Sequence, residues 1–258
     1  MNSILSLSVV ISYCPNEKIF IDRVVDECLK FSKDIIVVQS DHYFNGEEIP
    51  YDDRYRTNKN NVKVFTIQYD KNIAKEKGVR YYHNRFREFG WKNSTGDYIL
   101  FLDADEVPDG DRFREWLKLF KLELFSAVSL DAYWYFRDTT NQSLTTEETS
   151  LIFKSKDLFS ELFYNNQERW GMFFYKQSEP QERHRMIRNQ IDPISKEPLI
   201  HHYSWVRTKE EMIRKVSSWG HKNDEIDWKT LVEKEFEHEF DGTDFVHGYK
   251  YKKVKSFI

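Results

Sequence analysis

An apolar stretch that ends abruptly in acidic residues is the part of the sequence best suited to chemistry. Residues 98–102 have the composition of a buried strand and run directly into Asp103, Ala104, Asp105 and Glu106. Burying ionised carboxylates is costly unless a cation or hydrogen-bond donors compensate them. The acids therefore indicate a divalent metal site, and their oxygens suit Mg²⁺ or Mn²⁺. The alternative is a surface turn whose carboxylates are hydrated.

The Asp-x-Asp spacing of Asp103 and Asp105 is informative only through its context. A second pair with this spacing, Asp109 and Asp111 around Gly110, has no apolar strand directly before it. We interpret that second pair as a turn and the N-cap of a helix. Only the first pair is therefore a candidate for metal binding.

Two adjacent histidines, His201 and His202, could add a metal ligand from a distant part of the chain. They follow Leu199 and Ile200, an apolar pair that predicts a strand. Because successive side chains of a strand point to opposite faces, only one of the two can face a metal. We expect His202 to be that residue. The alternative is a packed or surface pair of histidines.

The elements before the acidic run alternate in the way typical of an α/β domain. Apolar residues at helical spacing follow the first apolar run, and the Tyr- and Arg-rich residues 79–93 predict a second helix before the fourth run. The four apolar runs predict strands at residues 5–13, 34–39, 62–67 and 97–102. This order predicts a mainly parallel sheet, whose ligand sites lie beyond the carboxyl ends of its strands.

The remainder of the chain is less regular. We expect a helix over residues 111–125, one or two strands over residues 126–137 and a polar loop over residues 138–150. Thr208 and Glu211 fit a capping box, which predicts a further helix. Aromatic residues of this half, among them Trp134, are expected either to pack in the core or to form a stacking platform for a sugar. The others of this set are Tyr133, Tyr135, Trp170 and Trp205.

Composition excludes some classes of protein. The 258 residues carry 39 Lys and Arg against 43 Asp and Glu, a net charge of −4, which does not favour nucleic acid as a partner. The two cysteines, Cys14 and Cys28, are too few for a disulfide framework or a four-cysteine zinc site.

No transmembrane stretch or leader is evident, so we expect a cytoplasmic protein. The basic, aromatic residues 249–255 leave peripheral membrane contact open, a solubilising tail being the alternative.

These features together resemble a glycosyltransferase of the GT-A fold, in the broad class that includes family 2. The resemblance lies in the first strand, in residues 34–40 and above all in residues 93–106, where a small residue, Gly, an acid and an apolar strand lead into the DxD motif. It implies a Rossmann-like α/β domain with a mainly parallel sheet flanked by helices. Residues 1–110 would bind the nucleotide-sugar. Residues 111–258, a smaller mixed region with the C-terminal helices, would form the acceptor-side half of the same globular unit.

The resemblance also implies a reaction. The chain would be a metal-dependent, hexosyltransferase-type enzyme that moves a sugar from a nucleotide-diphosphate donor, such as a UDP- or GDP-sugar, to a hydroxyl group. The acceptor would be a glycan, a lipid or a protein. Mn²⁺ or Mg²⁺ would be held by Asp105 as the more direct ligand, by His202, and by Asp103, which would lie near the ribose or the metal.

Further residues would contact the donor nucleotide by the same resemblance. Besides Asp103, the residues with this expected role are Ser12, Tyr13, Asp41, Arg85, Arg87 and Lys92. Asp41 falls where relatives carry a base-reading Asp, although their usual DDGSxD run is replaced here by Gln39-Ser40-Asp41-His42. Strand-end packing for Ser12 and Tyr13, and a hydrated helix face for the basic residues, are the alternatives.

The catalytic base is less well marked than the metal site. In this fold it is most often a carboxylate within hydrogen-bond reach of the acceptor. Glu168, Glu179 and Glu182 are candidates, with Glu168 and Glu182 preferred, and all lie in the segment dense in aromatic and charged residues. Two other functions stay open: a nucleotidyltransferase that makes nucleotide-sugars, disfavoured by the absence of glycine after the first strand, and a catalytically silent carbohydrate-binding relative.

Overall fold

The amino-terminal half of the protein is a parallel sheet. The computed structural model describes residues 5–164, 168–178, 185–219 and 226–258. Strands β1 (Leu7–Ser12), β2 (Ile35–Ser40), β3 (Val62–Ile67) and β4 (Tyr98–Asp103) lie in the order β3-β2-β1-β4 and are all parallel. Every residue of β1 and β2 is buried, as expected for strands covered on both faces. The carboxyl ends of β1 and β4 are adjacent, because Ser12 is the register partner of Asp103.

The same sheet continues into the second half of the chain, where it becomes mixed. β4 pairs antiparallel with β7 (Asn141–Lys154), and β7 pairs with β6 (Ala127–Phe136). Next to β6 lie β8 (Met186–Gln190) and β9 (Ile200–Trp205), and β10 (Tyr251–Lys253) pairs with β7. The short β5 (Glu106–Pro108) pairs with β9 and sets Glu106 opposite His202. The sheet thus brings the acidic run and the histidine together.

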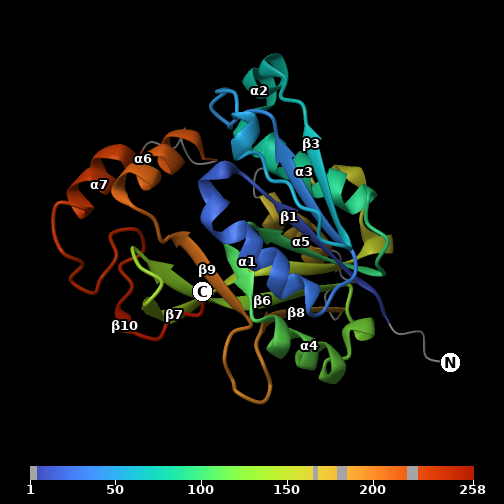
Figure 1. Ribbon diagram of the computed structural model, residues 1–258. Helices are drawn as coiled ribbons and strands as arrows, with labels where there is room; N and C mark the ends of the chain where they lie inside the picture. Colours follow the sequence, from blue (N-terminus) through green and yellow to red (C-terminus); the bar gives the residue numbers. More distant parts are fainter. Residues whose placement is uncertain (1–4, 165–167, 179–184, 220–225) are drawn as a thin grey trace.

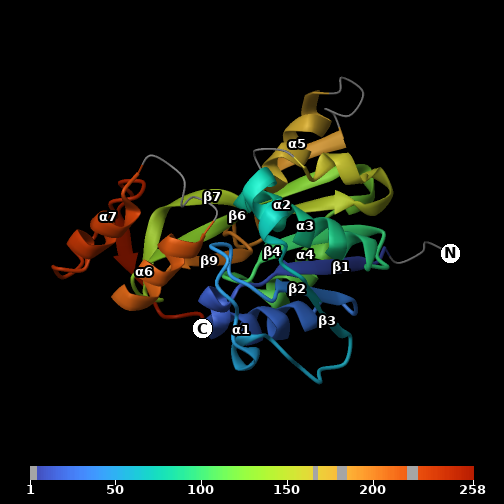
Figure 2. The same cartoon turned by 90° about the horizontal axis from the view of Figure 1, so that it is seen from above.

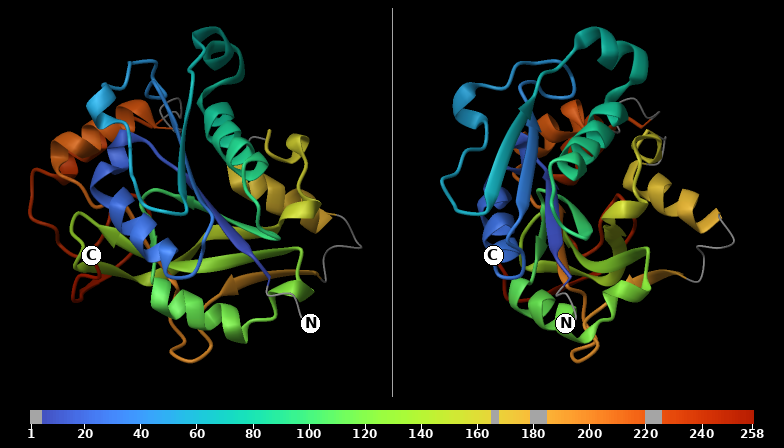
Figure 3. Two further views of the ribbon diagram at one scale, coloured as in Figure 1. Left: turned by 45° about the vertical axis from the view of Figure 1, so that its right-hand side comes forward. Right: turned by 90° about the vertical axis from the view of Figure 1, so that its right-hand side faces the viewer.

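Helices cover both faces of this sheet (Figures 1 and 3). α1 (Lys18–Leu29) and α4 (Gly110–Leu119) pack on one face, where Phe20, Val24 and Phe113 share a core with sheet residues. α3 (Val79–Lys92) and α5 (Glu168–Ser178) cover the other face, with α2 (Lys71–Lys77) leading into α3. This confirms the predicted α/β class, a curled sheet with much parallel pairing and helices on its two faces.

The last two helices lie apart from the others. α6 (Lys209–Ser218) and α7 (Trp228–Glu235) stand beside the ends of β6 and β9, on the left in Figure 2. They share a third core with Trp134, Phe136 and Trp205. α6 begins with the predicted capping box of Thr208 and Glu211. None of the described helices is both long and apolar enough to cross a bilayer.

Two expectations for the middle of the chain are wrong. The helix expected over residues 111–125 ends at Leu119, because the chain turns so that Phe120 stacks between Trp116 and Phe125 at ring distances of 4.4 and 5.3 Å. Residues 138–150 are not a polar loop, since residue 141 begins β7. A polar sequence forms a strand here because β7 has partners on both sides, β6 on one and β4 and β10 on the other.

We predict that Gly90 fixes how closely α3 approaches the sheet. A Cβ atom added at this position would lie 2.2 Å from Cγ1 of Val10 on β1. Gly90→Ala is therefore expected to lower the free energy of unfolding by about 1–3 kcal/mol through overpacking. Urea denaturation measures this, and Val10→Ala offers a matched background in which the added methyl has room. An equal cost of Gly90→Ala in both backgrounds would contradict the proposed contact.

Candidate functional site

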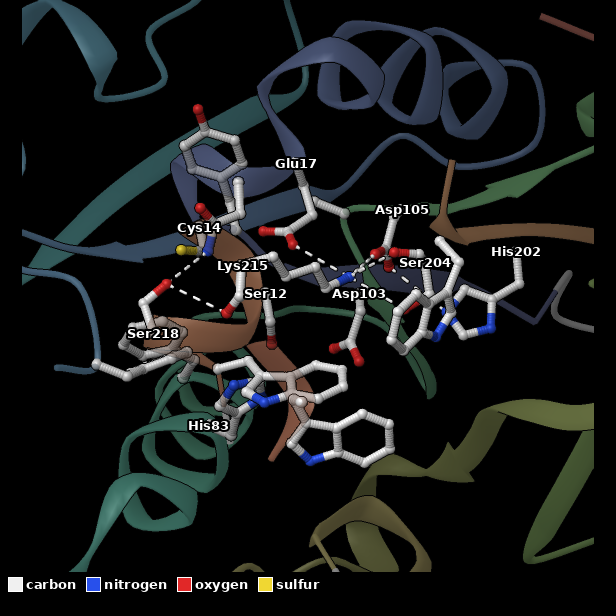
Figure 4. Close-up of a pocket in the computed structure, with 18 of the residues that line it drawn as sticks. Ser12, Cys14, Glu17, His83, Asp103, Asp105, His202, Ser204, Lys215 and Ser218 are labelled. Carbon is white, nitrogen blue, oxygen red and sulfur yellow. Dashed lines mark hydrogen bonds and ion pairs between the residues drawn. The ribbon is translucent and has the colours of Figure 1, made fainter. Parts of the chain in front are cut away.

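A cavity of about 350 Å³ opens where the carboxyl ends of β1 and β4 meet the second half of the chain (Figure 4). Ser12, Asp103 and Asp105 line it from the parallel sheet, and Lys215 from α6. His202 reaches it from β9. The cavity therefore combines acidic, basic and imidazole side chains from segments that are far apart in the sequence.

Backbone hydrogen bonds hold the acidic turn after β4 in place. The amide of Ala104 donates to the carbonyl of Ser12 at 3.0 Å, and the amide of Tyr203 donates to the carbonyl of Asp105 at 2.8 Å. Within the turn, the amide of Asp103 donates to Oε2 of Glu106 at 2.9 Å. The turn is thereby fixed to β1 on one side and to β9 on the other.

Arginines from two helices neutralise Asp103. Arg87 of α3, almost fully buried, donates from Nη2 to Oδ1 of Asp103 at 2.9 Å. Arg169 of α5 lies 3.8 Å from Oδ2 of Asp103 and binds both oxygens of the fully buried Glu106, at 2.7 Å for the bond to Oε2. Burial alone would raise the pKa of Asp103, but the two guanidinium groups outweigh it and lower that pKa to about 2.

Asp105 divides its two oxygens between different partners. Oδ2 accepts hydrogen bonds from Lys215 at 2.8 Å and from Arg207 at 3.2 Å, and both cations are buried. Oδ1 faces Nε2 of His202 at 3.6 Å. Burial would raise the pKa of Asp105, but Lys215, the imidazole and Arg207 together hold it well below its usual range. The carboxylate is therefore ionised, with one oxygen committed to fixed cations.

Glu17 completes this buried group of charges. It ends the short helical turn Pro15–Glu17 before α1, and its Oε1 lies 3.3 Å from Arg207 and 3.6 Å from Lys215. Figure 4 shows the ammonium of Lys215 between Glu17 and Asp105, where it also donates to Oγ of Ser204 at 3.0 Å. Burial raises the pKa of Glu17. We call Glu17, Asp105, Arg207 and Lys215 the Asp105 cluster.

Two residues at the cavity face each other in a way that suits a metal ion. Among the described residues, no group of three or more His, Cys, Asp or Glu side chains is placed to hold a metal. Oδ1 of Asp105 and Nε2 of His202 offer two ligands, and Nδ1 of His202 has no protein partner in the described part of the chain. A carboxylate and an imidazole suit Mn²⁺, and the other ligands would have to come from a bound substrate.

The structure separates the two histidines of β9. His202 lines the cavity, whereas His201 points into the core, stacked on Phe257 at a ring distance of 4.1 Å. Nδ1 of His201 is 2.7 Å from the hydroxyl of Tyr135. Burial lowers the pKa of His201 to about 3, so it is neutral. The alternation of side chains along the strand thus leaves His202 facing Asp105.

The residues expected at a nucleotide fall into two groups. Ser12 and Tyr13 line the cavity, and the hydroxyl of Tyr13 donates to the carbonyl of Asp53 at 3.0 Å. Asp41 does not line it; its Oδ1 accepts the amide of Tyr69 at 2.7 Å. Arg85 and Lys92 are also outside the lining. Lys92 pairs with Glu88 at 2.6 Å on the surface of α3, so only Arg87, through Asp103, is tied to the site.

The carboxylates expected to act as the base are not all described. Glu179 and Glu182 lie outside the described residues, and Glu168 is described only as the first residue of α5, without its side chain. Arg169, the next residue, binds Glu106. The amino-terminal end of α5 therefore lies at the acidic turn.

Lys215, Glu17 and Arg169 are site residues that the sequence analysis missed. Lys215 sits between Met212 and Val216 on the buried face of α6. A lysine at a core position of an amphipathic helix is the signal that could have revealed it, since lysine is almost never fully buried unless it is paired. Glu17 and Arg169 carry no comparable pattern, because they reach the site only through the tertiary fold.

Comparison with known proteins gives a family match over much of the chain. Residues 8–183 match the model of the family described as glycosyl transferase family 2. Among curated proteins, none matches the chain. Similar solved structures include S. aureus TarS 1–349, with 15% identity over 90% of this chain and 70% of that one and a TM-score of 0.45. Another is glucosyl-3-phosphoglycerate synthase from Mycobacterium tuberculosis, solved in complex with Mn²⁺, UDP and phosphoglyceric acid. It has 12% identity over 74% of this chain and 72% of that one, with a TM-score of 0.41. A third is the glycosyltransferase GlyE of Streptococcus pneumoniae TIGR4, with 14% identity over 90% of this chain and 64% of that one and a TM-score of 0.39.

We predict that the Asp105 cluster stabilises the fold as a unit. Lys215→Met leaves two buried carboxylates with Arg207 alone, so the free energy of unfolding is expected to fall by about 3 kcal/mol. In the double variant with Glu17→Gln the losses should be less than additive, by about 1 kcal/mol or more. Urea denaturation of the two single variants and the double variant measures this.

The control for this cycle is Lys229→Met, because the side chain of Lys229 is 64% exposed. It should change the free energy of unfolding by no more than about 0.5 kcal/mol. A cost for Lys215→Met as small as that of the control would show that the buried ion pairs do not hold α6 to the sheet.

Proposed function

Because the chain belongs to glycosyl transferase family 2, and is therefore a glycosyltransferase, we propose that it transfers a sugar from a nucleoside diphosphate donor to an acceptor hydroxyl. One observation carries the proposal: Oδ1 of Asp105 and Nε2 of His202 face each other across 3.6 Å at the cavity. They lie beyond the carboxyl ends of β1 and β4, where a parallel sheet binds its ligands.

We propose Mn²⁺ or Mg²⁺ as the cofactor, held by Asp105 and His202. When bound, the cation neutralises the negative charge that develops on the departing diphosphate. Because no group of three such ligands is found among the described residues, the donor's phosphate oxygens would complete the coordination. Asp103, fixed by Arg87 and still partly exposed to the cavity, is then free to accept hydrogen bonds from the ribose of the donor.

Charge counting supports a need for this cation. Asp103, Asp105, Glu106 and Glu17 are matched one for one by four buried cations, which are Arg87, Arg169, Arg207 and Lys215. These eight groups sum to zero when all are ionised and to +1 when Glu17, whose pKa burial raises to about 7, is protonated, which is less positive charge than a diphosphate carries negative charge. A divalent cation that enters with the donor supplies the missing positive charge.

We propose the following roles for the two halves of the chain. Residues 1–110 hold the nucleotide, with Ser12 and Tyr13 at its nucleoside, and a uridine or guanosine diphosphate as its carrier. Residues 111–258 hold the acceptor. During transfer, the bond between the anomeric carbon and the phosphate oxygen breaks, a bond to the acceptor oxygen forms, and the hydroxyl proton passes to a carboxylate base.

Glu168 is our preferred base over Glu182. α5 begins at Glu168, and the following residue, Arg169, binds Glu106 and lies 3.8 Å from Asp103. The start of α5 is thus anchored at the acidic turn, which favours a role at the reacting centre. The cytoplasmic location expected from the sequence stays a prediction.

We predict that metal and nucleotide bind together or hardly at all. With two protein ligands, Mn²⁺ alone and UDP or GDP alone should give little thermal stabilisation. Both together, at about 100 times the dissociation constant, should raise the melting temperature by about 5 °C or more, and EDTA should abolish the effect.

His202→Asn removes a proposed metal ligand without breaking the Asp105 cluster. This variant should no longer show the rise in melting temperature that metal and nucleotide together produce. His238→Asn, at an exposed histidine outside the cavity, is its control. Equal stabilisation of both variants would remove His202 from the metal site. Joint binding without any release of sugar from UDP- or GDP-sugars would identify the chain as a silent relative.

A further inference from the structure

One wall of the cavity consists of tryptophans. Four of the seven tryptophans of the chain, Trp134, Trp205, Trp219 and Trp228, line it. They come from β6, from the end of β9, from the residue after α6 and from the first residue of α7. Separate elements therefore converge to place these rings on one cavity, and we call the four residues the tryptophan wall.

The tryptophan wall begins directly beside the proposed metal ligands. Trp134 packs edge-to-face on His202 at a ring distance of 4.6 Å and on His247 at 4.9 Å. Trp219 meets Trp205 at 5.8 Å and Trp228 at 5.2 Å, both nearly at right angles. Because His202 also faces Asp105, a molecule bound against the wall has the reacting centre as its neighbour.

Packing accounts for part of this wall, since all four tryptophans belong to the third core or pack against it. Trp134 and Trp205 are buried, but Trp219 and Trp228 keep part of their surface exposed. Large aromatic surface on a cavity, rather than inside a dry core, is a feature of binding sites. The indole N–H of the buried Trp134 has no hydrogen-bond partner in the described part of the chain. Both features point to a ligand that completes the wall.

The polar groups between the rings indicate what that ligand is. His202, His247, Ser204 and Ser218 line the same cavity as the tryptophans. A sugar ring has an apolar C–H face that packs on an indole and hydroxyl groups that bind such polar side chains. An acyl chain would cover these polar groups without giving them hydrogen bonds, which costs free energy.

The position of the wall along the chain assigns it to the acceptor. Trp205, Trp219 and Trp228 lie beyond residue 183, where the match to the family ends. The proposed donor residues Ser12, Tyr13 and Asp103 line the cavity from the amino-terminal half of the chain. Three of the four residues of the wall therefore belong to the part of the chain that is not shared with the family model, and Trp134 joins them from within the matched residues.

We propose that the acceptor is a carbohydrate, bound with one sugar ring stacked on the tryptophan wall so that a hydroxyl group points toward Asp105 and His202. This inference rests on the proposed transferase function and narrows its acceptor from a glycan, lipid or protein to a glycan. The wall thus acts as a specificity determinant, and the stacking contact is made by the partly exposed rings of Trp219 and Trp228.

The test measures acceptor binding without turnover. Saturation-transfer NMR and tryptophan fluorescence would be recorded with methyl hexosides and disaccharides, with a short-chain lipid alcohol and with a Ser/Thr peptide. We expect carbohydrate alone to bind. Trp228→Ala should weaken the dissociation constant about tenfold, as expected for the loss of one aromatic stacking contact, and Trp228→Phe should weaken it less. Trp91→Phe, on α3 and outside the cavity lining, should bind like the wild type.

The joint stabilisation by Mn²⁺ and UDP or GDP, measured in every variant, separates the two proposals. If it persists while no carbohydrate binds, or while Trp228→Ala and Trp228→Phe bind like the wild type, the carbohydrate inference is overturned and the transferase function stands. Binding of the lipid or the peptide, lost in Trp228→Ala, would assign the wall to that class instead. Loss of the joint stabilisation in the wild type would overturn the proposed function itself.

Discussion

The cost of burying carboxylates at the end of β4 is the constraint on which the rest of the structure depends. Asp103, Asp105 and Glu106 are held at a strand end where water cannot solvate them fully. Each must therefore meet a cation, and the cations come from α3, α5, α6 and the residues after β9. An isolated buried charge is expensive, whereas a paired and hydrogen-bonded one is tolerated. Charge compensation thus fixes where these four segments lie.

This arrangement also leaves the site pre-organised. Oδ2 of Asp105 is held by Lys215 and Arg207, so the carboxylate cannot rotate freely and Oδ1 stays turned toward His202. The β5–β9 pairing sets Glu106 opposite His202 and keeps this edge in register. Groups fixed before the substrate arrives need no reorganisation during the reaction, which is where electrostatic catalysis gains its advantage. Under the proposed function, the same ion pairs would serve both stability and chemistry.

The local parts of this design could be predicted from the sequence, and the tertiary parts could not. The β1, β3 and β4 runs, the capping box of Thr208 and the context of Asp103 and Asp105 depend on short-range pattern, and each is visible in the residues themselves. The polar β7 depends on neighbours on both sides, which no local pattern contains. The partners of the acids lie 16 to 110 residues away in the sequence, so Lys215 and Arg169 had no sequence signal that linked them to Asp105 and Glu106. Alternation along the strand predicted that one of His201 and His202 would face away from the site, and the structure shows that His201 is that residue.

The two sides of the cavity are built from different physical chemistry, and this difference suggests how donor and acceptor are kept apart. Around the acidic turn, four buried acids meet four buried cations, so under the proposed function a phosphate would bring a cation with it. The tryptophan wall offers flat apolar surface with polar side chains beside it, which suit a sugar ring. His202 belongs to both sides, since it faces Asp105 and packs on Trp134. A metal-bound donor and a stacked acceptor would therefore meet at this one side chain, and its position on β9 sets the distance between them.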